Sequence, residues 1–321
     1  LSAGGYKAPK NGTEKYDGTA WSLSANMSIE NCTAVGFGTQ NAAAIAGGQG
    51  DYDGTELYNG STYSDAGNMG KQRRYGGSAG TQNAGLVFSG TSPSPAGNTD
   101  QADTETFDGN AWTEVNNMTV VRSLAGSAGT QNAAIIAGGY VHSPGANRNC
   151  TEIWNGTNWA AVANIITTRR ASAGIGTQNH FILAGGTTGA IVNTTEEWNG
   201  SSWSTTTSLG TARSTFAGSQ GGLGTAGIVA GGQTGSPTAT NTIEFWNDNS
   251  TTGSFGRVDF VGTGISGDAS LMTNVPLTTG TVSGSAQLAA QISGAFQRGF
   301  LLDGTISGSM TSTASFHTVD A

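Results

Sequence analysis

One short string recurs along most of this 321-residue chain. Gly-Thr-Gln-Asn begins at Gly38, Gly80, Gly129 and Gly176, with a degenerate copy at Gly224, and each copy runs into a small apolar stretch that ends in Gly-Gly or Ser-Gly. A second element follows it, consisting of a glutamate, an aromatic two residues later, an Asn or Asp turn and, in most copies, a further aromatic. Its six glutamates, separated by 42, 49, 47, 44 and 48 residues, are Glu14, Glu56, Glu105, Glu152, Glu196 and Glu244. A unit this short cannot bury its own core, so successive units must stack on one another.

Each unit predicts four antiparallel strands. In residues 169–203, a strand of small residues leads into Phe181-Ile182-Leu183-Ala184, which ends at a glycine pair. A third strand places Glu196 and Trp198 on one face by alternation, and an Asn-Gly turn of the hairpin type leads to a fourth strand at Trp203. Four short strands every 42–49 residues, without helical periodicity, are typical of a β-propeller blade.

These residues resemble the kelch repeat. The resemblance rests on an arginine before the first strand, a glycine pair ending the second, an aromatic-Asn/Asp turn and a Trp opening the fourth. The arginines are Arg73, Arg122, Arg169 and Arg213, and Asn31 occupies the first place in that series. The resemblance to the kelch repeat implies an all-β, kelch-type propeller over residues 1–256 with six recognisable four-stranded blades. The first blade lacks its first strand and most of its second. Either the C-terminal tail or residues upstream of Leu1, with a further blade possible, would close the ring, and we expect the upstream residues to do so.

The repeated glutamates and arginines indicate a structural role rather than catalysis, because a residue that is present once per blade has a role that every blade requires. We expect each glutamate to pair with an arginine of the adjoining first strand, or to accept backbone N–H groups near the blade junction. Buried pairs of this kind specify geometry more than they stabilise. The recurrent Trp and Tyr residues are expected in the core between blades.

The composition of the chain excludes several classes of function. The chain has 52 glycines, only 11% charged residues and a formal net charge of −8. The acidic balance argues against tracking nucleic-acid phosphates, and no apolar run is long enough to span a membrane. The remaining mix of small and aromatic residues favours an ordered all-β protein.

The known catalytic patterns are missing from the sequence. The three histidines, His142, His180 and His317, show no zinc spacing, and there is no phosphate-binding loop. No Gly-x-Ser-x-Gly elbow with a partner histidine and acid can be assembled either. Copper chemistry of the galactose oxidase type would need paired Tyr and His ligands and a Cys–Tyr crosslink, which Cys32 and Cys150 do not favour. We therefore expect a non-enzymatic protein with no catalytic, metal or cofactor-binding residues and no cofactor.

A ligand or partner site, if present, is expected in the two longest loops between a glycine pair and the next glutamate, residues 91–104 and 140–151. An aromatic, an arginine and several amides there are suited to a sugar, and ordinary surface or subunit contacts are the alternative. The candidate residues are Asp100, Gln101, Asp103, Tyr140, His142, Asn147 and Arg148.

Residues 257–321 form a different region, rich in Gly, Ser and Thr. Residues 267–276 resemble a motif of phage fibre stems, and residues 281–294 resemble the C-terminal segments of marine phage tail-fibre proteins. Leu288, Ile292 and Phe296 share one face of a short helix predicted at 285–297. Such a helix cannot bury itself alone, so we expect an extended tail that packs on the propeller or on another subunit.

Together these resemblances imply a virion structural protein of a tailed phage, in a tail-fibre, collar or surface-decoration position. Its expected partners are other virion subunits, through residues 257–321, and a host-surface glycan; a homo-oligomer is expected. The alternative is a secreted or cell-surface bacterial lectin or adhesin. An intracellular adaptor fits poorly, because such modules usually accompany other domains.

Overall fold

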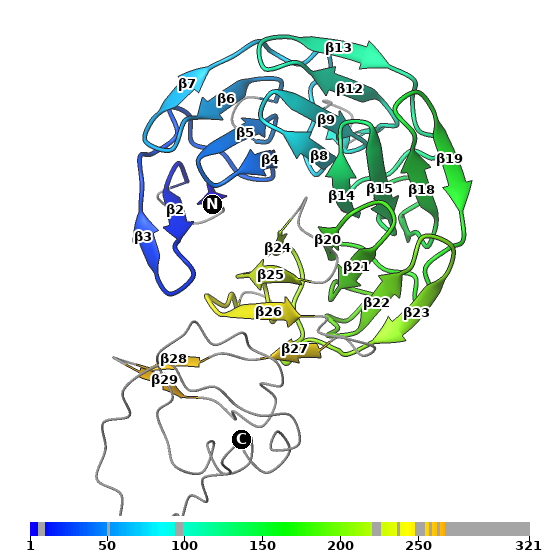
Figure 1. Cartoon of the computed structure of the whole chain (residues 1–321). Helices are drawn as coiled ribbons and strands as arrows, with labels where there is room; N and C mark the ends of the chain where they lie inside the picture. Colours follow the sequence, from blue (N-terminus) through cyan, green and yellow to red (C-terminus); the bar gives the residue numbers. More distant parts are fainter. Residues whose placement is uncertain are drawn as a thin grey trace, which may run out of the picture. The chain divides into compact units, whose positions relative to one another are not determined.

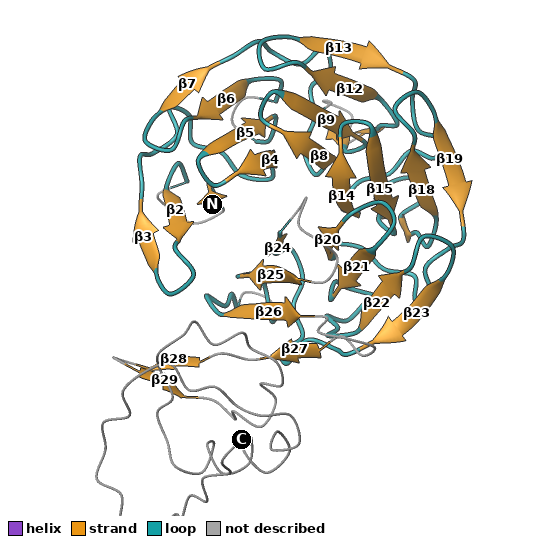
Figure 2. Ribbon diagram, in the orientation of Figure 1, coloured by secondary structure: helices purple, strands orange, loops and turns teal. Residues whose placement is uncertain are grey.

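A computed structural model of the chain describes residues 1–5, 10–49, 52–93, 99–219, 226–235 and 238–247, and the backbone of strands at 254–256, 259–261 and 264–266. These residues form strands and loops, with no helix among them (Figure 2). Within the same residues, no helix of membrane-spanning length and hydropathy is found. The predicted helix at 285–297 and the fibre-like segments lie outside the described residues.

Six small antiparallel sheets follow one another around a ring, as a six-bladed propeller (Figure 1). Blade 1 is β1 (Ser2–Ala3), β2 (Thr13–Tyr16) and β3 (Trp21–Leu23); blade 2 is β4 (Val35–Thr39), β5 (Ala42–Ala46), β6 (Thr55–Tyr58) and β7 (Tyr63–Asp65); blade 3 is β8 (Gly77–Thr81), β9 (Ala84–Phe88), β12 (Thr104–Phe107) and β13 (Trp112–Val115). Blade 4 is β14 (Gly126–Thr130), β15 (Ala133–Ala137), β18 (Thr151–Trp154) and β19 (Trp159–Val162); blade 5 is β20 (Ala173–Gly176), β21 (Phe181–Ala184), β22 (Thr195–Trp198) and β23 (Trp203–Thr206); blade 6 is β24 (Ala217–Gly218), β25 (Ala226–Ala230), β26 (Ile243–Asn247) and β27 (Ser254–Gly256).

The predicted all-β propeller is confirmed, including the shortened first blade. Blade 1 has three strands, and β1 is a two-residue remnant that pairs with β2 through Ser2 and Glu14. Tyr16 of blade 1 and Phe245 of blade 6 have ring centroids 6.1 Å apart, so the first and last sheets are neighbours. All the described strands lie within Leu1–Leu271, which forms one compact unit by its internal contacts.

Among the described residues, three two-stranded hairpins lie outside the blade sheets. They are β10–β11 (Thr91–Ser92, Thr99–Asp100), β16–β17 (Tyr140–Val141, Ala146–Asn147) and β28–β29 (Asp259–Val261, Gly264–Ser266). The first two extend the long connections between the second and third strands of blades 3 and 4. These are the two loops that the sequence singles out.

The cores lie between blades. The cluster between blades 3 and 4, for example, joins Phe88 with Ile136 and Trp154, all at most 1% exposed. Similar clusters fill the junctions between blades 2 and 3, 4 and 5, and 5 and 6. The innermost strands carry Ala, Gly and Ser, because the sheets converge there and leave little room for side chains.

A chain of backbone hydrogen bonds encircles part of the central channel. One residue just before the innermost strand of each of blades 2 to 6 has a left-handed φ between 54° and 63°, although none is glycine; these residues are Thr33, Tyr75, Leu124, Ala171 and Thr215. Each N–H from Tyr75 onward donates to the carbonyl of the preceding member, at 3.0, 3.0, 2.7 and 3.0 Å. Five positions of the main chain are therefore held in an unfavourable conformation by a shared network.

Candidate functional site

Each of four blade junctions contains a buried ion pair between the repeated arginine and glutamate. The Nη2 to carboxylate distances are 2.6 Å for Arg73–Glu105, 2.9 Å for Arg122–Glu152, 3.0 Å for Arg169–Glu196 and 2.6 Å for Arg213–Glu244. All eight side chains are at most 2% exposed. The arginine lies in the segment entering the blade that carries the glutamate, as expected from the sequence.

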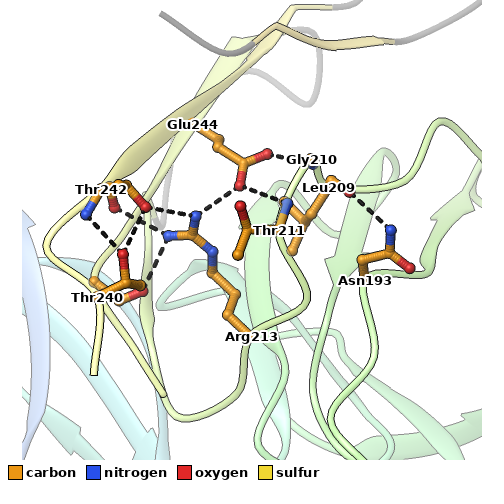
Figure 3. Close-up of polar contacts among 9 residues, drawn as sticks. Asn193, Leu209, Gly210, Thr211, Arg213, Thr240, Thr242 and Glu244 are labelled. Carbon is orange, nitrogen blue, oxygen red and sulfur yellow. Dashed lines mark hydrogen bonds and ion pairs between the residues drawn. The ribbon is translucent and has the colours of Figure 1, made fainter. Parts of the chain in front are cut away.

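Each pair is completed by backbone groups. In Figure 3, Glu244 also accepts from the N–H groups of Gly210 and Thr211, at 2.6 and 3.2 Å. Arg213 Nη1 donates to the carbonyls of Gly231 and Thr242, both at 3.0 Å. The charges are thus compensated inside the junction, and they are not available to act on a substrate.

Burial lowers the pKa of Arg73, Arg122 and Arg169 from the ordinary guanidinium value, because a charged group loses hydration there. The facing glutamates Glu105, Glu152 and Glu196 oppose this effect and favour the charged arginine, and Cys150 does so more strongly for Arg122. The ion pairs therefore favour the charged form of these arginines against the effect of burial.

The remaining two repeat glutamates differ. Glu56 is 7% exposed and is bonded by Ser28, since Asn31 stands where the other junctions have arginine. Glu14 is exposed on β2 of the shortened blade. Four of the six glutamates thus pair with arginine and Glu56 accepts a backbone N–H, which are the two arrangements that the sequence predicts; Glu14 shows neither among the described residues.

The two long loops come together on one face of the ring. His142 of the β16–β17 hairpin donates its backbone N–H to Asp100 Oδ2, at 2.6 Å, and its Nδ1 lies 2.8 Å from Asp100 Oδ1. Asp100, at the end of β11, is 6% exposed at its side chain, whereas His142 is 27% exposed. Ser123 Oγ donates to the same carboxylate at 3.2 Å. Loops of blades 3 and 4 are thus joined at this point.

An arginine that sequence reasoning missed completes this cluster. The guanidinium of Arg170 stacks on the ring of Tyr140, with its carbon 4.3 Å from the centroid, and donates to Asn147 Oδ1 at 2.9 Å. The Tyr140 ring also contacts the His142 ring edge-to-face, with centroids 5.1 Å apart. We call Asp100, Tyr140, His142, Asn147 and Arg170 the loop cluster. The only sequence signal for Arg170 was the Arg-Arg dipeptide at 169–170, repeated at 73–74.

The other three candidate residues lie outside this cluster. Gln101 and Arg148 make main-chain bonds to Gly90 and Gly139. The carbonyl of Asp103 accepts from Arg73 Nη1 at 2.9 Å, which ties it to the blade junction.

The central channel forms a cavity of about 770 Å³. Its lining includes Tyr16, Phe37, Tyr75 and Phe216 among many Ala, Gly, Ser and Thr residues, and among the described lining residues there is no Asp, Glu, His, Lys or Arg. No group of three or more His, Cys, Asp or Glu in the described part of the chain could hold a metal ion. The titratable side chains that line the channel within this same part are those of Tyr16, Cys32 and Tyr75.

A scan against protein-family models finds no match, and a search of curated proteins finds none either. Among solved structures, the chain is similar to that titled "Structure of YjhT", with a TM-score of 0.66 and 11% sequence identity, covering 77% of this chain and 91% of the other. At this identity the similarity shows the propeller fold alone, a fold that suits binding of a ligand or a protein.

Proposed function

We propose that this chain is a non-catalytic virion protein of a tailed phage, in a tail-fibre, collar or surface-decoration position. The propeller presents the loop cluster to a neighbouring subunit or to the host surface. The observation that carries the binding role is the arrangement of the cluster. It places an aromatic ring, a guanidinium, an amide and a partly exposed imidazole side by side on one face.

Two further observations support this proposal. The described lining of the central channel carries no Asp, Glu, His, Lys or Arg side chain, whereas the loop cluster combines charged, aromatic and amide groups. The resemblance of residues 267–294 to phage fibre segments supports the virion position, and the low charge suits an extracellular particle.

The experiment combines the oligomeric state with adsorption. The full chain is purified, its mass in solution is measured by light scattering, and its binding to host cells and to a glycan array is compared with that of Tyr140→Ala. Asn110→Ala is the matched control, because Asn110 is exposed in the β12–β13 turn at the opposite end of the blades.

A symmetric multimer whose adsorption falls at least tenfold in Tyr140→Ala, and is unchanged in Asn110→Ala, is the expected result. A monomer that neither associates nor adsorbs would contradict the proposal.

A second candidate, a carbohydrate-binding lectin or adhesin, is favoured by one contact. The Tyr140 ring, stacked by Arg170 and flanked by Asn147, combines an aromatic platform with hydrogen-bonding groups suited to a sugar. Specific binding of one glycan by a monomer, abolished by Tyr140→Ala, would favour the lectin over the virion protein.

A further inference from the structure

The junction between blades 1 and 2 lacks the guanidinium that the next four junctions contain. Asn31 keeps one of the arginine's contacts: its Nδ2 donates to the Gly47 carbonyl at 2.6 Å, as Arg213 Nη1 donates to the matching carbonyl of Gly231. The shorter side chain does not provide the contact to the glutamate. Glu56 is therefore the buried repeat glutamate whose positive partner has been replaced.

Glu56 is left with incomplete compensation. Its Oε1 accepts from the Ser28 N–H at 2.7 Å and from the Ser28 hydroxyl, and within the described residues its Oε2 has no hydrogen-bond partner. A second carboxylate adds to this charge, because Asp65 lies directly opposite Glu56 in the β6–β7 register. Ser28 Oγ is also 3.4 Å from Asp65 Oδ1. Two facing carboxylates, one of them buried, repel each other unless a cation is present.

A cavity of about 140 Å³ lies beside these groups. Its polar lining is Asn31, Gly54, Thr55, Glu56, Asp65 and Asn68. The carbonyl of Gly54 has the same place in its repeat as the carbonyl of Thr242, which accepts from Arg213. The cavity is large enough for a cation with several waters, since one water takes about 30 Å³ in the liquid.

Asn31 supplies an independent observation. Its side chain is 7% exposed and lines the cavity, its Nδ2 donates to Gly47, and its Oδ1 lies against Gly48 with no hydrogen-bond partner. A buried carbonyl oxygen without a donor costs free energy unless something binds it. The junction thus combines a buried carboxylate without the cation of the other junctions, a second carboxylate opposite it and free capacity on a backbone carbonyl.

We propose that this cavity binds one oxygen-coordinated metal cation, Ca²⁺ by its chemistry, which supplies the charge of the absent arginine. The ligands are the carboxylates of Glu56 and Asp65 and the Gly54 carbonyl, with waters completing the shell. Ca²⁺ accepts six to eight oxygens in flexible geometry, whereas Mg²⁺ demands a near-octahedral shell and gives up water reluctantly. The absence of nitrogen and sulfur ligands disfavours zinc and copper.

The test uses the full chain after treatment with a chelator. Thermal unfolding is followed with CaCl₂, MgCl₂ or guanidinium chloride at equal low-millimolar concentrations, and calorimetry gives the stoichiometry. We expect Ca²⁺ to raise the Tm by roughly 2–5 °C at concentrations ten or more times its Kd, with one ion bound per chain.

Four variants locate the site. Asn31→Arg rebuilds the pair of the other junctions, so it should raise the Tm without Ca²⁺ and abolish the Ca²⁺ shift. Glu56→Gln should abolish the shift, and Asp65→Asn should weaken Ca²⁺ binding at least tenfold. Glu114→Gln is the matched control, since Glu114 faces Glu105 in the same register but its junction contains Arg73.

An unchanged Tm of the wild-type chain in Ca²⁺ would overturn the proposal, as would an equal shift in Glu56→Gln and the wild type. Stabilisation by millimolar guanidinium but not by Ca²⁺ would also overturn it, and would assign the cavity to a planar organic cation. Should Asn31→Arg not fold, Glu56→Gln and Asp65→Asn still decide the question.

Discussion

Gln131 donates from its side-chain Nε2 to the backbone carbonyl of Phe107, 3.0 Å away in the preceding blade. The same amide donates to the carbonyl of Gly85, also at 3.0 Å, while the backbone carbonyl of Gln131 accepts from Trp154 Nε1 within its own blade. Gln82 and Gln178 repeat the two-carbonyl arrangement at their own junctions. The Gly-Thr-Gln-Asn string therefore recurs because its glutamine links adjacent sheets.

Replacing Gln131 with alanine should lower the free energy of unfolding by about 1–3 kcal/mol, since two carbonyls lose a donor. The measurement is urea-induced unfolding followed by tryptophan fluorescence. Gln233→Ala is the control, because Gln233 is exposed and only its main chain is hydrogen-bonded among the described residues. A similar loss in both variants would show that Gln131 does not link the blades.

Removing one member of a buried ion pair should lower the free energy of unfolding more than removing both members. Arg169→Met leaves Glu196 buried without its cation and should cost about 3–5 kcal/mol. The double variant Arg169→Met/Glu196→Leu should recover most of that loss, because no buried charge remains. Equilibrium denaturation of the three proteins tests this, and a double variant less stable than Arg169→Met would contradict it.

The left-handed residues beside the channel predict a stabilising glycine. Ala171 has a φ of 55°, which glycine adopts without a Cβ penalty, so Ala171→Gly should raise stability by up to about 1 kcal/mol. Ala173→Gly, two residues later in β20, is the matched control and should lower stability by about 1 kcal/mol. Thermal unfolding of the two variants tests this. A lower melting temperature for Ala171→Gly than for Ala173→Gly would show that the backbone strain at Ala171 is not significant.

The pKa of the Asp108 carboxyl should lie below its ordinary value of 3.8. The N–H groups of Ala111 and Asn110 donate to its carboxylate at 2.8 and 2.9 Å and lower its pKa. Because the folded pKa is depressed, the stabilisation is fully present above the unfolded pKa and is lost as the pH falls through the folded pKa.

A carbon-detected NMR titration of the Asp108 carboxyl measures this directly. Asp108→Asn should keep the turn and remove its acid sensitivity, since Asn155 accepts the same pair of N–H bonds in the next blade. A midpoint at or above 3.8 would contradict the expectation.

The sequence predicts what recurs and misses what is specific to one place. The Glu–Arg pairs and the four strands per blade follow from the repeat, since each position has copies to compare. The contact of Asp100 with His142 joins two hairpins from different blades. It is not part of the repeat pattern, so the sequence offers no second copy for comparison. The Asn31 exception is visible in the sequence, but the cavity beside Glu56 appears only once the neighbouring strands are in place.

The left-handed φ values at Tyr75 and Leu124 could not be predicted from the sequence, for another reason. Sequence reasoning assigns such backbone to glycine, and here hydrogen bonds between blades hold other residues in it. Local preference is overridden by the tertiary network.

The backbone chain around the channel has one more consequence. Its bonds use only main-chain atoms, so the side chains at these five positions, which include Tyr75 and Ala171, are not needed to hold the ring together. All five face the central cavity. The mouth of the channel can therefore change its size and chemistry by substitution at these positions, while the scaffold that supports it remains the same.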